Sequence, residues 1–182
     1  MSAGQAQAQH EAAIAGAEVA EPRIEVIHVD EYLAVVHKPA GLMAHASAMA
    51  RGEEDFLVDR LREQFGKSVY LVHRLDRATS GCLLIAFDRE TAGALGRIFM
   101  SREVSKDYLA VCRGWPEPDS FVIDAPLIRE GEVRPCPVYV KQCVHASGKP
   151  CRTEIQVLER VVRGNDSESR FAIVRAVPLT GR

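Results

Sequence analysis

The chain lacks the features that mark several large classes of protein. Its five cysteines, at positions 82, 112, 136, 143 and 151, form no C-x-x-C pair. This odd, widely spaced set indicates neither a zinc site nor a disulfide framework, so we expect no metal, reduced thiols and a cytoplasmic protein. No apolar run approaches the roughly 20 residues of a membrane-spanning helix, so no membrane association is expected. Both G-x-G-x-x-G and Walker loops are missing, and a nucleotide cofactor therefore has no support.

An excess of positive charge is also missing. The formal net charge is −2 and the pI is about 6.3, whereas a domain that holds nucleic acid chiefly through phosphates is usually basic. Between Arg74 and Arg113, however, seven basic residues stand against five acidic ones. This local excess is consistent either with one basic face or with an ordinary solvated surface of mixed charge, and the sequence leaves both open.

The size and composition predict one globular domain. At 182 residues, with 47% hydrophobic and 26% charged residues, the chain can bury a substantial core without disulfides or metals. Residues 1–22 lack the cationic and continuous apolar segments of a secretory signal, so we expect a flexible leader that ends near Pro22. The domain is therefore placed at residues 23–182, incomplete at its C-terminus, and we expect the full-length protein to be monomeric.

Strand patterns outnumber helix patterns along the chain. Amphipathic spacing predicts two helices, at residues 54–65 and 88–100, with Gly66 ending the first and Asp88 capping the second. The second helix is expected to bury a stripe made of Ala92, Leu95, Ile98 and Phe99. Strands are predicted at residues 24–29, 32–37, 82–87, 106–112, 121–124, 138–144, 153–159 and 171–177. The first two flank Asp30-Glu31, which favours a tight hairpin. In the strand at 106–112, Tyr108, Ala110 and Cys112 are expected on one face and Leu109 and Val111 on the other. Turn signals at 147–149 and 164–166 separate the last three strands and favour antiparallel pairing between them. The expected fold is α+β, a mixed, mostly antiparallel sheet with a few flanking helices.

The decapeptide Val72 to Gly81, VHRLDRATSG, concentrates the polar chemistry of the chain. It precedes a strand-length apolar run, so it should form a loop at the mouth of a strand, where reactive side chains are commonly placed. The cations Arg74 and Arg77 favour the ionised form of Asp76, and an ionised carboxylate suits a nucleophile. The alternative is that Asp76 only shapes the turn by accepting local hydrogen bonds.

The same decapeptide resembles the signature loop of the RluA-type pseudouridine synthases, with Asp76 at the position of the family's catalytic aspartate. Three further motifs of the family occur in the right order. KPAG at 38–41 lies before the decapeptide, and KDYLAV at 106–111 and PLTGR at 178–182 lie after it. The resemblance runs from about residue 24 to residue 182. Around Cys112 to Trp115 it is strongest to the tRNA pseudouridine synthase C branch of the family, so tRNA is the expected RNA partner.

The resemblance implies a role for each candidate site residue. Asp76 is the expected nucleophile. Tyr108 is expected to stack on the target uracil and assist proton removal, although its spacing alone is more typical of a core aromatic. Arg74 is expected to fill the space left by a flipped base and to contact phosphate. Arg77 is the second candidate substrate-binding residue, although it is also expected, with His73, to shape the loop.

Two motifs receive a more limited interpretation. The tetrapeptide 38–41 ends a strand, because proline removes a hydrogen-bond donor and glycine permits a bend, and we assign Lys38 no chemistry. In the resembled family the last motif continues to an arginine that pairs with the catalytic aspartate. The sequence stops at Arg182, so we expect truncation within this motif and an impaired site.

The reaction expected from the resemblance is isomerisation of a uridine to pseudouridine, which needs no cofactor. Large-subunit (23S) ribosomal RNA is the alternative substrate, and a catalytically silent RNA-binding domain is the alternative function. A hydrolase built on Asp76, His73 and Ser80 is a third reading. It is disfavoured because the G-x-S-x-G elbow is missing and the three residues fall within eight positions.

Overall fold

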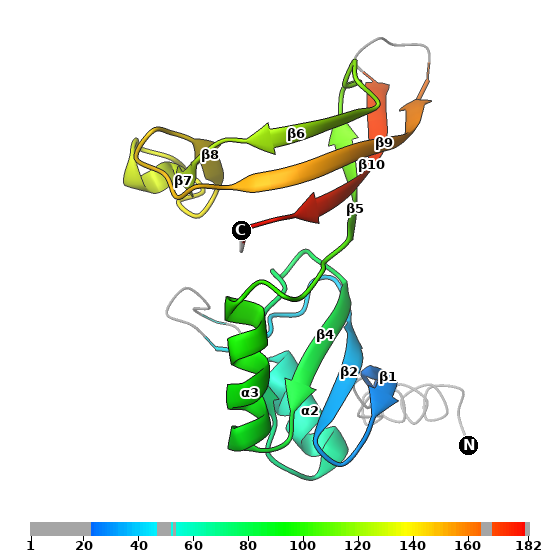
Figure 1. Cartoon of the computed structure of the whole chain (residues 1–182), viewed down its shortest axis with the longest axis vertical. Helices are drawn as coiled ribbons and strands as arrows, with labels where there is room; N and C mark the ends of the chain where they lie inside the picture. Colours follow the sequence, from blue (N-terminus) through cyan, green and yellow to red (C-terminus); the bar gives the residue numbers. More distant parts are fainter. Residues whose placement is uncertain (1–22, 47–51, 53, 165–168, 181–182) are drawn as a thin grey trace, which may run out of the picture. The chain divides into compact units, whose positions relative to one another are not determined.

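The computed structural model describes residues 23–46, 52, 54–164 and 169–180. The predicted leader, residues 1–22, lies outside the described residues. Contacts divide the chain into two compact units, Met1–Gly96 and Arg97–Arg182, which Figure 1 shows in blue to green and in green to red, respectively. Each unit is described by itself.

The first unit contains a four-stranded antiparallel sheet in the order β1-β2-β4-β3. Its strands are β1 (Glu25–Val29), β2 (Leu33–Lys38), β3 (Tyr70–Leu71) and β4 (Gly81–Ala86). The predicted hairpin of β1 and β2 is confirmed. Its turn is fixed by Asp30, whose Oδ1 accepts the backbone N–H groups of Tyr32 and Leu33 at 2.8 and 2.9 Å.

The alternation along β2 places every second residue in the core. Ala34, Val36 and Lys38 are fully buried, and the residues between them are more exposed. Two of the three lie opposite equally buried residues of β4, since Ala34 pairs with Ile85 and Val36 with Leu83. A strand has a side-chain period of two, so the same register that buries two apolar residues also buries a lysine.

Helix α2 (Leu57–Phe65) contributes Leu57, Val58 and Leu61 to this core. It begins three residues later than predicted, because Phe56 is extended and forms a parallel bridge with Met43. The predicted end is confirmed: Gly66 has φ 64° and donates its N–H to the carbonyls of Arg62 and Glu63. A left-handed residue at this position favours glycine.

Helix α3 (Arg89–Met100) is capped as predicted, since Asp88 accepts the N–H and the hydroxyl of Thr91, both at 2.7 Å. The predicted buried stripe, Ala92, Leu95, Ile98 and Phe99, is wrong in one respect, because the helix has no fully buried residue and Ile98 is exposed. The helix passes from the first unit to the second after Gly96, so no single core encloses the stripe.

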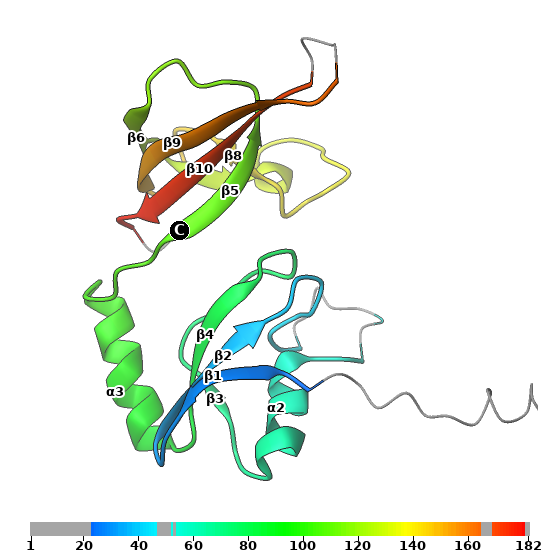
Figure 2. The same cartoon turned by 90° about the vertical axis from the view of Figure 1, so that its right-hand side faces the viewer.

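The second unit contains a four-stranded antiparallel sheet in the order β5-β10-β9-β6. Its strands are β5 (Tyr108–Arg113), β6 (Ser120–Asp124), β9 (Arg152–Val162) and β10 (Arg170–Pro178). A separate antiparallel pair, β7 (Leu127–Arg129) and β8 (Gln142–Val144), flanks the short 3-10 helix η1 (Glu130–Glu132). Figure 2 shows the long strands β9 and β10 side by side, as their register requires.

The predicted α+β class is confirmed, with sheets that are mostly antiparallel. Antiparallel pairing of β9 with β10 is also as predicted. The strand expected at 138–144 is shorter, because a turn closed by a 3.0 Å bond from the N–H of Lys141 to the carbonyl of Val138 precedes β8. Its expected place beside β9 is wrong, since β8 pairs with β7.

Two backbone segments of the first unit are tied together where β2 ends. The buried Nζ of Lys38 donates to the carbonyls of Leu42 at 2.7 Å, Pro39 at 2.8 Å and Arg77 at 3.3 Å. Gly41, at φ 90°, donates its N–H to the carbonyl of Arg77 at 2.8 Å, and the Nε of Arg77 donates to the carbonyl of Gly41 at 2.9 Å. The turn after β2 therefore holds the segment that contains Arg77 through the backbone.

Replacing Lys38 with methionine tests this tie. Methionine keeps much of the buried volume but donates no hydrogen bond, so the carbonyls of Pro39 and Leu42 lose this donor. An acceptor left unpaired in the interior costs about 1 to 3 kcal/mol, so the free energy of unfolding in urea should fall by about 2 to 4 kcal/mol. The exposed Lys149 provides the control, and Lys149→Met should change it by less than about 0.5 kcal/mol. Equal stability of the two variants would contradict the tie.

Candidate active site

The signature loop, residues 72–80, connects β3 to β4 and is held by groups from the core of the first unit. Leu75 is buried in the middle of the loop. The Nε2 of His73 accepts the backbone N–H of Leu84 in β4 at 2.9 Å, which requires that nitrogen to be unprotonated. A turn follows, in which the N–H of Thr79 donates to the carbonyl of Asp76 at 3.1 Å. His73 therefore shapes the loop, as predicted.

The reactive groups project outward from this anchored backbone. The Asp76 side chain is 84% exposed and the Arg74 side chain 63% exposed, and they form an ion pair with 3.6 Å between Arg74 Nη2 and Asp76 Oδ1. Leu75, between them in sequence, points into the core. The loop thus presents a carboxylate and a guanidinium to solvent on one fixed segment, an arrangement suited to a substrate that arrives from outside.

Lys38 is a site residue that the sequence interpretation missed. Burial lowers the pKa of its ammonium group, and the negative charge of Asp76 acts in the opposite direction. Lys38 therefore interacts with the signature loop in two ways, through its charge and through its hydrogen bond to the carbonyl of Arg77. The sequence did contain a signal for the burial of Lys38. This residue falls two positions after Val36 and four after Ala34, so the strand period of two places it on the apolar side.

Tyr108 opens β5 in the second unit, and the predicted alternation of this strand holds from Tyr108 to Val111 but not at Cys112, which is exposed. Tyr108 and Ala110 are half-buried, whereas Leu109 and Val111 are 74% and 70% exposed. Tyr108 pairs with Ala176 of β10. Its ring therefore lies on the side of the sheet that also carries the buried Val174, which pairs with Ala110.

An ion pair fixes the start of this strand against β10. The guanidinium of Arg175 donates to both carboxylate oxygens of Asp107, from Nε at 2.6 Å and from Nη2 at 2.8 Å. These hydrogen bonds, followed by the attraction between the charges, hold the pKa of the Asp107 carboxyl below its ordinary value. The pair therefore positions the backbone next to Tyr108.

The last motif is described as far as Thr180. Its hydroxyl accepts the backbone N–H of Arg152 at 3.0 Å, and the N–H of Leu179 donates to the carbonyl of Arg152 at 2.9 Å. These bonds extend the pairing of β10 with β9 past Pro178. Gly181 and Arg182, the end of the predicted motif, lie outside the described residues.

The candidate residues therefore fall into two groups. Asp76, Arg74 and Arg77 come together on one loop of the first unit, where Arg77 is tied to Gly41, and Tyr108 belongs to the second unit. Within the described ranges, no group of three or more His, Cys, Asp or Glu side chains could hold a metal ion. Among the same residues, no helix is both long and apolar enough to cross a membrane.

The depressed pKa of Asp107 predicts an acid-dependent loss of stability. A carboxyl group with a lower pKa in the folded than in the unfolded chain stabilises the fold above its unfolded pKa, and this contribution is lost as the pH falls through the folded pKa. Asp107→Asn should therefore lower the melting temperature at pH 7, and the difference from the parent protein should shrink towards pH 3. Asp124→Asn, an exposed substitution in the same sheet, should have little effect at either pH. A constant Asp107→Asn difference across this range would exclude the proposed linkage.

The comparisons with known proteins agree with these motifs. Residues 32–182 match the RNA pseudouridylate synthase family. The chain is 34% identical to tRNA pseudouridine synthase C of Vibrio cholerae serotype O1 over 161 residues. The aligned region covers 87% of this chain and 65% of that protein. It is 35% identical over 162 residues to the dual-specificity RNA pseudouridine synthase RluA of Vibrio vulnificus, covering 89% of this chain and 62% of that protein.

Solved structures give the same result. Human RNA pseudouridylate synthase domain containing 1 matches with a TM-score of 0.68 and 28% identity, over 89% of this chain and 63% of that chain. The chain thus spans slightly less than two thirds of the length of these relatives. The RluA-type resemblance of the four motifs is confirmed, and the chain belongs to the RNA pseudouridylate synthase family.

Proposed function

We propose that this chain carries the catalytic aspartate of an RNA pseudouridine synthase that isomerises a uridine in tRNA. The observation that supports this most directly is the geometry of the signature loop. Its backbone is fixed by Leu75, His73 and the tie to Gly41, while the carboxylate of Asp76 faces solvent beside Arg74. Catalytic groups gain from such positioning, because a reacting atom held in place avoids much of the entropic cost of the encounter.

The chemistry of the isomerisation suits a carboxylate nucleophile. The glycosidic bond between the ribose and N1 of uracil breaks, the base turns, and a bond from the same sugar carbon to C5 forms as C5 loses a proton and N1 gains one. No electrons are gained or lost overall. Asp76 is proposed to form the transient covalent bond, and its exposed carboxylate leaves room for the substrate.

The target uridine must leave its stack before it can reach this carboxylate. Extruding a base costs a few kcal/mol. A group that occupies the vacated space lowers that cost, and the long, 63% exposed side chain of Arg74 is proposed to do so while its guanidinium contacts phosphate. Arg77 is proposed to help hold the substrate from a position fixed by its bond to Gly41.

Tyr108 is proposed to stack on the extruded uracil and to assist the removal of the C5 proton. Two features support this. Its strand is fixed by the Asp107–Arg175 pair, and its aromatic ring can bind the face of any pyrimidine. The phenol provides the polar group that a proton transfer needs.

The choice of tRNA follows from the similar proteins. One relative is named for action on tRNA and another as a dual-specificity enzyme. The second name supports testing a further RNA class. Large-subunit ribosomal RNA is the alternative substrate.

Asp76→Asn tests the proposed nucleophile. The amide has nearly the same size but cannot form the covalent bond, so pseudouridine formation in tRNA by the intact gene product should fall by about 10³-fold or more. The measurement is mass spectrometric or chemical mapping of pseudouridine after incubation with tRNA and, separately, with a 23S ribosomal RNA fragment.

The control for this substitution is Asp59→Asn, at an exposed carboxylate of α2 paired with Arg62, which should retain full activity. Binding of tRNA by Asp76→Asn should stay within about threefold of the parent protein, because the nucleophile contributes little to ground-state binding. Product formation by Asp76→Asn at the parental rate would remove Asp76 from the mechanism. Binding without product by the parent protein would support a silent RNA-binding domain instead.

Substitutions of Tyr108 separate stacking from proton transfer. Tyr108→Phe keeps the ring and loses the hydroxyl, so kcat should fall by about 10²-fold or more with little change in KM. Tyr108→Leu loses both and should also weaken RNA binding, by about 1 to 3 kcal/mol per stacked base. Single-turnover kinetics and equilibrium binding with the same tRNA measure the two effects. If Tyr108→Phe is fully active, the tyrosine acts only by stacking.

A further inference from the structure

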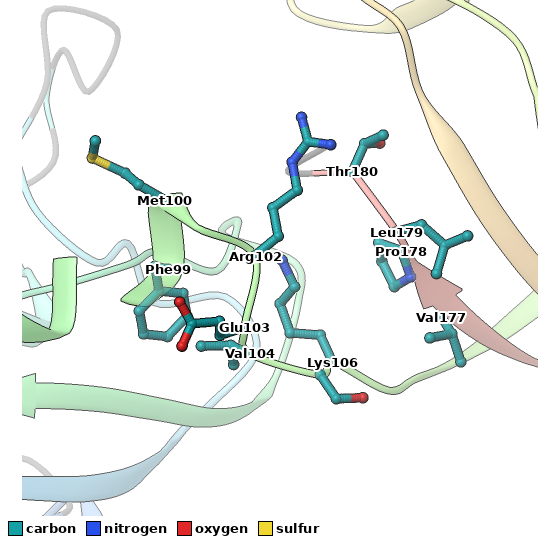
Figure 3. Close-up of a pocket in the computed structure, with 11 residues that line it drawn as sticks. Phe99, Met100, Arg102, Glu103, Val104, Lys106, Val177, Pro178, Leu179 and Thr180 are labelled. Atoms are coloured by element: carbon teal, nitrogen blue, oxygen red, sulfur yellow. The ribbon is translucent and has the colours of Figure 1, made fainter. Parts of the chain in front are cut away.

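A cavity of about 470 Å³ lies within the second unit, between residues 99–106 and residues 177–180. Figure 3 shows the side chains that line it. Its apolar wall includes Phe99, Val104, Val177 and Leu179. The lining also includes two cations, Arg102 and Lys106, to which the proposed reaction assigns no role.

The cavity lining contains these two cations and a single carboxylate. That carboxylate belongs to the exposed Glu103, which accepts a hydrogen bond from the hydroxyl of Ser101. Lys106 is half-buried and Arg102 is exposed. Neither has an ion pair or hydrogen bond from its side chain to any other described residue. The cavity therefore has a net positive lining, in a protein whose net charge is −2.

The backbone conformation of Arg102 gives a second, independent reason to assign it a function. Helix α3 ends in a Schellman motif, in which the N–H of Glu103 donates to the carbonyl of Ile98 at 3.3 Å, and Arg102 occupies the left-handed position with φ 64°. Glycine is strongly favoured there. Helix α2 ends with Gly66 at the same φ of 64°. An arginine in place of glycine is less favourable for the fold, and such strain is concentrated at functional positions.

The cations are also close to the chemistry in sequence. Lys106 lies two residues before Tyr108, and the opposite wall of the cavity is the end of β10, which pairs with the Tyr108 strand. In Figure 3 the Arg102 side chain extends towards Thr180. A phosphate bound here would be held next to the strand that carries Tyr108.

From these observations we propose that Arg102 and Lys106 bind a phosphate ester in this cavity, and that the phosphate belongs to the backbone of the RNA substrate. The apolar wall accommodates the adjoining sugar or base. This inference rests on the proposed function for the identity of the ligand, but the site itself is defined by the cavity, the two unpaired cations and the left-handed arginine.

Arg102→Gly tests the proposal, because it removes the cation and relieves the backbone strain in one step. The melting temperature should stay the same or rise, whereas tRNA binding should weaken by about three- to tenfold at moderate salt. The slope of log affinity against log salt concentration should fall by about 0.7 to 1 for Arg102→Gly and by about twice that for Arg102→Gly combined with Lys106→Gln. Fluorescence titration of labelled tRNA with the full chain at several salt concentrations measures these values.

The control is Arg163→Gln, which removes one exposed positive charge just after β9 ends. Arg163 donates its backbone N–H to Ser169, just before β10 begins, so it lies at the opposite end of that strand from the cavity. Its salt slope should match that of the parent protein. An unchanged slope in the double variant, or an equal loss in Arg163→Gln, would overturn the proposal.

Titrations with inorganic phosphate and uridine 5′-monophosphate identify the source of the phosphate. NMR signals of the methyl groups of Val104, Val177 and Leu179 should shift on addition of tRNA and remain unchanged in the double variant. Shifts with uridine monophosphate but not with tRNA would instead assign the cavity to a free nucleotide and overturn the RNA assignment. Pseudouridine formation by the parent protein is measured on the same tRNA. If the parent protein forms no product but its salt slope still differs from that of the double variant, the proposed isomerase function is rejected and the phosphate site stands. If product forms but the two slopes are equal, the proposed phosphate site in the cavity is rejected.

Discussion

The site depends on the need to satisfy one buried ammonium group. The alternation of β2 forces Lys38 into the core behind Ala34 and Val36, where an unpaired charge would cost several kcal/mol. The donors on its Nζ are taken by three carbonyls that belong to two separate segments, the turn after β2 and the loop at Arg77. Neither segment can move without leaving part of this charge unsatisfied. A cation in the core therefore determines where the exposed loop lies.

This constraint explains how the loop combines rigidity with exposure. Leu75 and His73 hold the backbone to the core and to β4, while Arg74 and Asp76 remain in solvent. A carboxylate on a mobile loop would lose conformational entropy each time it met a substrate. Here much of that entropy is already lost in the folded protein, and a macromolecular substrate can still reach the group.

The sequence predicted those features that depend on local chemistry. The hairpin at Asp30, the cap at Asp88, the stop at Gly66 and the alternation around Tyr108 follow from side-chain period and turn residues, and all are present. Features that depend on distant partners were missed. The role of Lys38 required knowledge of carbonyls up to 39 residues away. The pairing of β8 with β7 joins strands too short to carry a periodic signal.

Net charge is a poor guide to RNA binding in this chain, because many of its cations are already paired. In the second unit Arg175, Arg134 and Arg160 form ion pairs with Asp107, Glu130 and Asp119. Within the second unit, these pairs add nothing to the net charge and offer less to a phosphate than cations without a carboxylate partner do. Under the function proposed above, RNA affinity draws on the cations that have no carboxylate partner, and selection of the target depends on extrusion and stacking of one base.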